Sequence, residues 1–256
     1  MIKKLDILGS RIDNLSMDET LALCKQRILD KEQLLVFTPN TEIIMMCYKD
    51  EEFRNLINSS DINIPDGVGL ILGSKLKKKK LKEKVAGFEL SMNLIEEANL
   101  KHLKLYIVAG KPGVAETACE NIRKKYSNVD IVGCQNGYFK GSHLGIENSA
   151  EELAIIEDIN DKQPDILFVG LGAKKQELWA YKNAKRINAK IIIGNGGTTD
   201  VIAGNVKRAP DFFVRCGLEW LYRLINQPSR IKRQILLPQF LLKIIFGGKD
   251  TIKIIE

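Results

Sequence analysis

The stretch Asp61-Ile-Asn-Ile-Pro-Asp-Gly-Val-Gly-Leu70 places one carboxylate, Asp66, between a short apolar strand and a glycine-bearing turn. Pro65 fixes its own φ and favours extended backbone before it, whereas Gly67 lets the chain turn sharply afterwards. In open α/β sheets, ligands bind beyond the carboxyl ends of the strands. The stretch therefore predicts a catalytic base at Asp66 or, as the alternative, a carboxylate that only caps the following helix.

Short apolar runs alternate with helical patterns on both sides of this stretch. Strands are predicted at residues 5–8, 34–37, 103–108, 129–132, 166–169 and 190–193, and helices at 16–29, 42–48, 51–58, 150–160 and 175–187. Strands that alternate with helices indicate a parallel sheet with right-handed crossovers. We therefore predict an α/β, Rossmann-like core over residues 1–206, with a mostly parallel sheet flanked by helices.

The composition changes after residue 206. Arg223, Arg230 and Arg233 follow one another at intervals of seven and three residues, and apolar residues dominate positions 235–246. Basic amphipathic segments of this kind are typical of elements that lie on a membrane surface. We predict a helical, membrane-contacting appendage over residues 207–256; the alternatives are a helix that covers the sheet and a contact between subunits. We also expect a chain cut near Asp211 to keep a folded core and to lose activity.

The charge and cysteine content of the chain indicate its kind of partner and its cellular compartment. A formal net charge of +7 and a pI of about 9.0 predict an anionic partner, which could be nucleic acid, a phosphorylated substrate or an acidic membrane. The five cysteines lack CxxC spacing, which favours a reducing compartment over a zinc or disulfide framework. The N-terminal apolar run is too short for a signal peptide, and no apolar run is long enough to span a bilayer. We expect a cytoplasmic protein that associates peripherally with the inner face of the membrane.

Glycines recur in the loops that lead into helices, with Gly110, Gly172 and Gly197 among them. Such turns present free N–H groups and the positive end of a helix dipole to phosphate. Neither G-x-G-x-x-G after the first strand nor the G-x-x-x-x-G-K-[ST] loop is present. The glycines therefore predict a nucleotide site of another type, although α/β turns also need glycine for purely structural reasons.

Taken together, the motifs make the sequence similar to the WecG/TagA/CpsF glycosyltransferases over nearly its whole length. The matching segments are Thr38-Pro-Asn40, Pro65-Asp-Gly67, Gly110-Lys-Pro-Gly-Val114, Pro164-Asp165, Val169-Gly-Leu-Gly-Ala173, Lys175-Gln-Glu177, Gly196-Gly-Thr198, Asp200, Ala203-Gly204, Lys207-Arg-Ala-Pro210 and Gly217-Leu-Glu-Trp220. The resemblance implies transfer of N-acetylmannosamine from UDP to N-acetylglucosamine on a polyprenyl diphosphate. We expect no cofactor. A homo-oligomer is a further expectation.

An inverting transfer needs a base for the acceptor hydroxyl and stabilisation of the departing diphosphate. Asp66 is the candidate base, and Thr38 and Asn40 are candidates to hold the acceptor or the donor. The resemblance places uracil and ribose contacts around Tyr138, Gln176 and Asp200. It adds Lys84 and Glu177 to the donor site. Arg223, Arg230 and Arg233 are expected to grip the lipid diphosphate.

The chain departs from the family pattern at several positions. Lys84 stands where arginine is usual, Glu89 where aspartate is usual and Lys174 where proline is usual, while Asn195 and Thr199 replace apolar residues. No Asp-x-Asp tripeptide occurs, which predicts a mechanism without a bound metal. Two other functions remain open: transfer of another UDP-sugar to a lipid acceptor, and a nucleotide- or RNA-binding regulator. Aromatic residues form only 7% of the chain and are not interleaved with the basic runs, so we expect no nucleic-acid partner.

Overall fold

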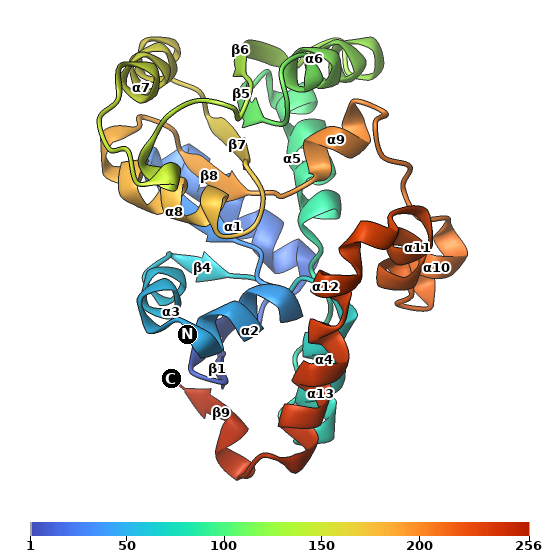
Figure 1. The fold of residues 1–256 in the computed structure, drawn as a ribbon. Helices are drawn as coiled ribbons and strands as arrows, with labels where there is room; N and C mark the ends of the chain where they lie inside the picture. Colours follow the sequence, from blue (N-terminus) through green and yellow to red (C-terminus); the bar gives the residue numbers. More distant parts are fainter. Residues whose placement is uncertain (1, 256) are drawn as a thin grey trace.

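The computed structural model describes residues 2–255 and is centred on a six-stranded sheet (Figure 1). The strand order is β4-β3-β8-β7-β5-β6, and all neighbouring pairs are parallel. The bounds are β3 Leu34–Phe37, β4 Ile62–Asn63, β5 Lys104–Ala109, β6 Asp130–Gln135, β7 Ile166–Gly170 and β8 Ile191–Gly194. The predicted α/β class with a parallel sheet is therefore confirmed.

Helices cover both faces of this sheet because its strands are apolar on both sides. In β8, Ile191 and Ile193 face one core cluster and Ile192 faces the other, as the two-residue period of a strand requires. The helices α1 Met17–Asp30, α5 Gly87–Lys101 and α6 Val114–Lys125 pack on the first face. The helices α2 Thr41–Lys49, α3 Glu51–Asn58, α7 Ala150–Lys162 and α8 Lys175–Asn183 pack on the second.

A second, antiparallel sheet joins the two ends of the chain (Figure 1). Its order is β2-β1-β9, with β1 Lys4–Ile7, β2 Ser10–Asp13 and β9 Ile252–Ile255. The strand β9 was not predicted, so the C-terminal segment is not entirely helical as expected. Its Ile252 is buried in a third core cluster together with Leu5 and Ile7. The sequence did not predict β9 because the run is only four residues long and its pairing partner, β1, lies at the opposite end of the chain.

The C-terminal helices are α10 Asp211–Arg215, α11 Glu219–Asn226, α12 Ile231–Gln234 and α13 Leu236–Phe246. Helix α13 packs along α4 Val68–Leu76, whose Gly69 and Gly73 form one small-residue face (Figure 1). A Cβ at Gly69 would lie 2.5 Å from Leu237, and one at Gly73 would lie 2.9 Å from Phe240. The absence of side chains at Gly69 and Gly73 therefore permits the close approach of the two helices.

Phe240 and Ile244 of α13 are fully buried. Removal of all residues after Asp211 would thus expose part of the core, which weighs against the expectation that such a fragment stays folded. Whether residues 207–256 form a unit of their own stays a prediction. Among residues 2–255, no helix combines the length and the apolar character that crossing a bilayer requires.

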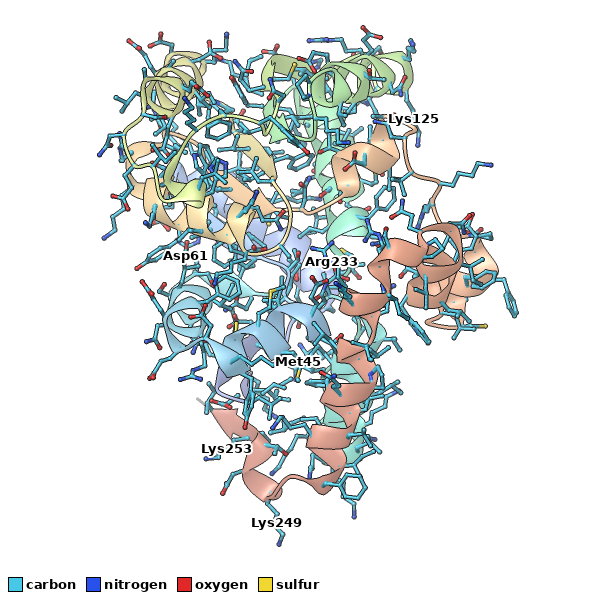
Figure 2. The ribbon with its side chains drawn as sticks, viewed as in Figure 1. Met45, Asp61, Lys125, Arg233, Lys249 and Lys253 are labelled. Carbon is cyan, nitrogen blue, oxygen red and sulfur yellow. The ribbon has the colours of Figure 1, made fainter. Side chains whose placement is uncertain are left out.

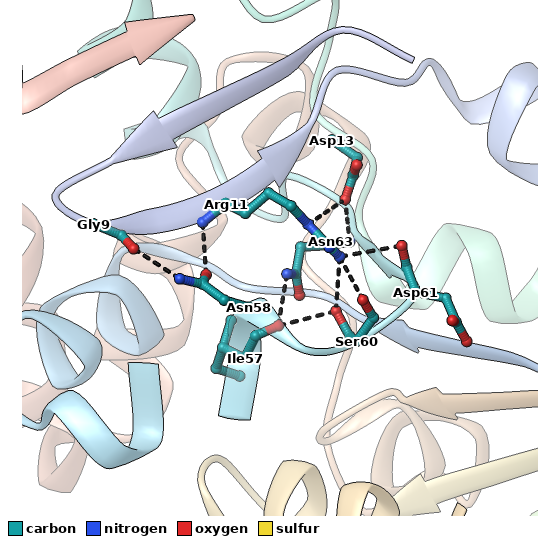
Figure 3. Close-up of polar contacts among 8 residues, drawn as sticks. All are labelled: Gly9, Arg11, Asp13, Ile57, Asn58, Ser60, Asp61 and Asn63. Carbon is teal, nitrogen blue, oxygen red and sulfur yellow. Dashed lines mark hydrogen bonds and ion pairs between the residues drawn. The ribbon is translucent and has the colours of Figure 1, made fainter. Parts of the chain in front are cut away.

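A polar cluster around Arg11 attaches the small sheet to the strand before Asp66 (Figure 3). Arg11 Nη2 donates to the Ser60 carbonyl at 2.6 Å, and its Nε lies 3.3 Å from Asp13 Oδ2. Asp13 in turn accepts the backbone N–H of Asn63 at 2.7 Å, while Asn58 exchanges bonds with Gly9 and Arg11. These contacts hold β4 in place three residues before the catalytic candidate.

Candidate active site

One cleft runs along the carboxyl ends of the six strands. It is lined by all but one of the predicted site residues: Thr38, Asn40, Asp66, Lys84, Gly110, Tyr138, Gly172, Gln176, Gly197, Asp200, Arg223, Arg230 and Arg233. The exception is Glu177, which is fully buried behind the cleft wall. The parallel sheet brings together the residues that follow its strands, because those loops all leave from the same edge, whereas Lys84 lies before α5 and the three arginines come from the C-terminal helices.

Asp66 stands in the cleft between β4 and α4. Its backbone N–H donates to the Pro39 carbonyl at 3.0 Å, and its Oδ2 accepts the N–H of Gly87 at 3.3 Å. Gly67 follows with a φ of 101°, a conformation that favours glycine. Burial raises the pKa of Asp66 to about 6, although the Gly87 N–H, Arg223 and Lys84 act in the opposite direction. The side chain makes no capping bond to α4, so the capping alternative is not what the structure shows.

Thr38 and Asn40 reach the same part of the cleft from the end of β3. The Thr38 hydroxyl donates to the Gly194 carbonyl at 3.0 Å and is buried. The Asn40 side-chain oxygen accepts the N–H groups of Glu42 and Ile43, at 3.0 and 3.1 Å, as the N-cap of α2. The amide NH₂ of Asn40 and the lone pairs of Thr38 stay available to a substrate.

Gln176 and Glu177 form a buried pair at the start of α8. Gln176 Nε2 donates to Glu177 Oε1 at 2.8 Å, and Gln176 Oε1 accepts the N–H of Gly196 at 3.1 Å. Burial raises the pKa of Glu177 to about 7. Glu177 therefore orients Gln176 and, through it, the glycine turn after β8, and its position behind the wall keeps it from direct contact with a ligand.

The end of the cleft away from Asp66 is open and carries an exposed aromatic side chain, Tyr138. Tyr138 is 67% exposed after β6, and the N–H of its neighbour Gly137 donates to the Gly110 carbonyl at 2.8 Å. Gly110 and Gly172 have φ values of 71° and 86°. This end combines a flat aromatic face with exposed backbone groups, a surface that suits a nucleobase and its phosphates.

Five cations from four parts of the chain line the cleft: Lys84, Lys111, Arg223, Arg230 and Arg233. Lys84 Nζ lies 2.6 Å from Glu219 Oε2, and Arg233 Nε lies 2.8 Å from Glu42 Oε1. Within residues 2–255, Arg223 and Arg230 have no carboxylate at ion-pair distance. Burial lowers the pKa of Arg230, and the neighbouring charges of Arg223 and Arg233 lower it further. Arg223 and Arg230, the two arginines without a carboxylate partner among the described residues, suit a multiply charged anion such as a diphosphate. Figure 2 shows Arg233 at the junction between the sheet and the C-terminal helices.

Sequence reasoning missed Glu219 as a site residue, although it lies in the Gly217-Leu-Glu-Trp220 segment. Only the packing of α11 against the cleft brings it to Lys84. In the part of the chain that is described, no group of three or more His, Cys, Asp or Glu side chains is arranged to hold a metal ion. Metal-independent transfer stays a prediction.

An α/β fold with a cleft at its strand ends is common to many enzymes, and the family match of nearly the whole sequence identifies this one as a glycosyltransferase. Residues 5–251 match the model of the glycosyl transferase WecG/TagA/CpsF family, and the chain belongs to this family. The family assignment weighs against the interpretation as an RNA-binding regulator.

Individual relatives share a more specific name, N-acetylglucosaminyldiphosphoundecaprenol N-acetyl-β-D-mannosaminyltransferase. The relative from Bacillus spizizenii is 32% identical over 85% of this chain and 81% of its own length. The Bacillus subtilis relative is 32% identical over 88% of this chain and 84% of its own. The Staphylococcus aureus relative is 29% identical over 94% of this chain and 92% of its own.

Proposed function

We propose that this chain transfers N-acetylmannosamine from UDP-N-acetylmannosamine to the 4-hydroxyl of N-acetylglucosamine on undecaprenyl diphosphate, the linkage-unit step of wall teichoic acid synthesis. The names of its relatives support this reaction. The observation that carries it is the single cleft in which Asp66, the glycine turns and the arginine cluster face one another.

Asp66 is the general base of this proposal. A base with a pKa of about 6 is mostly ionised at neutral pH and still accepts a proton readily. It removes the proton of the acceptor hydroxyl as that oxygen attacks the anomeric carbon. The C1–O bond to UDP breaks at the same time, and attack from the opposite face inverts the configuration.

The charge of the leaving UDP falls on groups of this chain. The N–H groups of Gly172 and Gly197 and the guanidinium groups of Arg223 and Arg230, which have no carboxylate partner among the described residues, bind phosphate oxygens. Arg233 and Lys84 already form ion pairs with carboxylates. They contribute positive charge to the cleft, but their side chains are held by these partners. The same arginines bind the diphosphate of the lipid acceptor.

A surface at the far end of α4 and α13 is proposed to meet the membrane. Leu242, Ile245 and Phe246 are 53%, 50% and 83% exposed, and Leu76 is 54% exposed beside them. Lys77, Lys79, Lys249 and Lys253 line one shallow depression at this end of the molecule, where Figure 2 shows Lys249 and Lys253. Exposed apolar side chains with lysines near them suit an anionic bilayer, which would make the protein peripheral at the cytoplasmic face.

The test uses the full chain, UDP-N-acetylmannosamine and a lipid-diphosphate N-acetylglucosamine acceptor. We expect transfer in EDTA at the rate seen without it, and a β-linked product. Substitution Asp66→Asn should abolish transfer while UDP binding persists. Transfer only from another UDP-sugar would assign the chain to a different donor, and loss of activity in EDTA with recovery in Mn²⁺ would refute the metal-independent mechanism.

A further inference from the structure

Asn195 lies in the floor of the cleft directly after β8 and is only 5% exposed. Its backbone is fully used: the N–H donates to the Val169 carbonyl at 3.1 Å, and the carbonyl accepts the N–H and the hydroxyl of Thr198 at 3.2 and 2.7 Å. Neither Oδ1 nor Nδ2 of the side chain has a hydrogen-bond partner among the described residues. The fold therefore holds this amide in place without using it.

The other buried polar side chains of the cleft behave differently. They are Thr38, Gln176 and Thr198. Each of these is bonded within the protein: Thr38 to Gly194, Gln176 to Glu177 and Gly196, and Thr198 to the Asn195 carbonyl. A buried amide without partners destabilises the ligand-free protein, and a ligand that bonds both of its atoms removes this penalty. Asn195 is thus the buried group that most needs a ligand.

The strand order indicates which part of the donor lies above Asn195. Strand β8 is next to β3, which ends just before Thr38, and β3 is next to β4, which precedes Asp66. Tyr138 follows β6, three strands from β8 in the other direction, and neighbouring strands lie about 4.8 Å apart. The anomeric carbon must lie at the acceptor oxygen that Asp66 deprotonates. The hexose therefore occupies the Thr38 and Asn195 part of the cleft, and uracil extends towards Tyr138.

The end of β7 is Gly170, which places no side chain beside the Asn195 amide. A Cβ at Gly170 would lie 3.4 Å from Asn195 Oδ1 and 2.9 Å from the Gly196 carbonyl. A side chain there would cover the amide oxygen. Both amide atoms are nevertheless out of contact with solvent in the ligand-free structure, so a sugar reaches them only with a local rearrangement of the cleft floor.

We propose that Asn195 binds the hexose of the UDP-sugar and is a specificity-determining residue for that sugar. Its Nδ2–H donates to, and its Oδ1 accepts from, ring hydroxyl or acetamido groups, which offer a donor and an acceptor together. This inference rests on the proposed function, since it assumes a UDP-sugar donor with its reacting carbon at Asp66. A site that hydrogen-bonds a substrate group discriminates strongly against a donor that lacks or misplaces it.

The test compares Asn195→Leu, which has nearly the same shape and no polar atoms, with the unsubstituted chain. Binding of UDP and of UDP-N-acetylmannosamine is measured by calorimetry, and rates are measured with UDP-N-acetylmannosamine, UDP-N-acetylglucosamine and UDP-glucose. We expect unchanged affinity for UDP, about tenfold or greater weakening for UDP-N-acetylmannosamine and a narrower rate difference between donors. Thermal unfolding should occur at the same or a higher temperature, because an unpartnered buried amide is lost.

Thr199→Val is the matched control. Thr199 Oγ1 is also buried without a partner, but Thr199 does not line the cleft. Its removal should leave both affinities unchanged. Equal weakening of UDP and UDP-sugar in Asn195→Leu would place the amide at the nucleotide and overturn the inference, as would no weakening at all. If the unsubstituted chain uses a different UDP-sugar, the proposed function fails. The role of Asn195 is then tested by whether Asn195→Leu weakens binding of that donor more than binding of UDP.

Discussion

Lys84 Nζ lies 2.6 Å from Glu219 Oε2, and this ion pair joins α11 of the C-terminal segment to the loop beside Asp66. Both side chains are partly buried, at 22% and 23% exposure, so solvent screens the pair only in part. The two charges act on Asp66 in opposite directions, because Lys84 lowers the pKa of its carboxyl and Glu219 raises it. The C-terminal segment therefore influences the base through charge as well as through packing.

Substitution Glu219→Gln should lower the pKa of Asp66, because it removes the raising charge and leaves Lys84 in place. The acid limb of kcat/KM should then move to lower pH. Substitution Lys84→Gln should raise the pKa of Asp66, because it removes the lowering charge, and should move the acid limb of kcat/KM to higher pH. The measurement is the pH dependence of kcat/KM with saturating acceptor.

Glu147→Gln serves as the control for this pair of variants. It also breaks a lysine ion pair, with Lys182, but neither residue lines the cleft. Its pH profile should match that of the unsubstituted chain. Shifts of the same sign in Glu219→Gln and Lys84→Gln would contradict the electrostatic account.

Asp66→Asn should lower kcat by about 10²- to 10⁴-fold, the usual contribution of a general base. The folded protein should not become less stable. The pKa of Asp66 is about 6 in the folded chain against 3.8 for an ordinary aspartate, so its ionisation destabilises the fold above pH 6. Thermal unfolding of Asp66→Asn at pH 7.5 should therefore occur at an equal or higher temperature, and this gain should shrink as pH falls from 6 to 4.

The exposed Asp130→Asn, at the opposite ends of the strands, is the control for that series. It should change neither activity nor the pH dependence of unfolding. A large loss of stability in Asp66→Asn at neutral pH would mean that the carboxylate is structural. In the unsubstituted chain, kcat/KM should fall as pH drops below about 6, since protonated Asp66 cannot accept the acceptor's proton.

Gly73→Val should separate α13 from α4. The added side chain would meet Phe240, whose ring already lies 2.9 Å from the position of a Cβ, and overpacking of this kind costs about 1 to 3 kcal/mol. Because α13 follows the arginine cluster in the chain, we expect weaker binding of the lipid acceptor and a lower unfolding temperature. Gly248→Ala is the control, since a Cβ there meets no atom within 4 Å. Normal acceptor binding by Gly73→Val would show that the helix contact does not position the arginines.

Arg11→Met should destabilise the chain by about 3 to 5 kcal/mol, because it leaves the buried Asp13 carboxylate without its cationic partner. The measurement is the free energy of unfolding in urea. The double variant Arg11→Met with Asp13→Asn should recover part of this loss, since the unpaired charge is gone. Equal stability of the single and double variants would show that the ion pair does not hold β4.

Local sequence patterns were enough to predict many of the strands and helices of this protein. The strands around Leu35, Ile107 and Ile192 could be predicted because each is a short apolar run between turn residues. The capping box at Ser16 and Glu19 marked the start of α1 and is present. The Pro-Asp-Gly triplet at Asp66 indicated a strand end, and the carboxylate lies in the cleft.

Local sequence patterns did not predict contacts between residues far apart in the chain. The pairing of β9 with β1 joins the two ends of the chain, and four residues in isolation do not specify a partner. The family resemblance placed Glu177 in the donor site, yet the turn of α8 directs its side chain into the interior. Nothing in the segment around Glu219 indicates that its partner is Lys84.

The sequence alone determined the alternation of strands and helices, the glycine turns and the family, because each depends on residues close together in the chain or on their order. The tertiary structure decided which of the candidate residues share a cleft, which carboxylates are buried deeply enough for their pKa to rise, and which amide is left without a partner. Those properties depend on the distance and dielectric between groups far apart in sequence, and only the packed fold sets them.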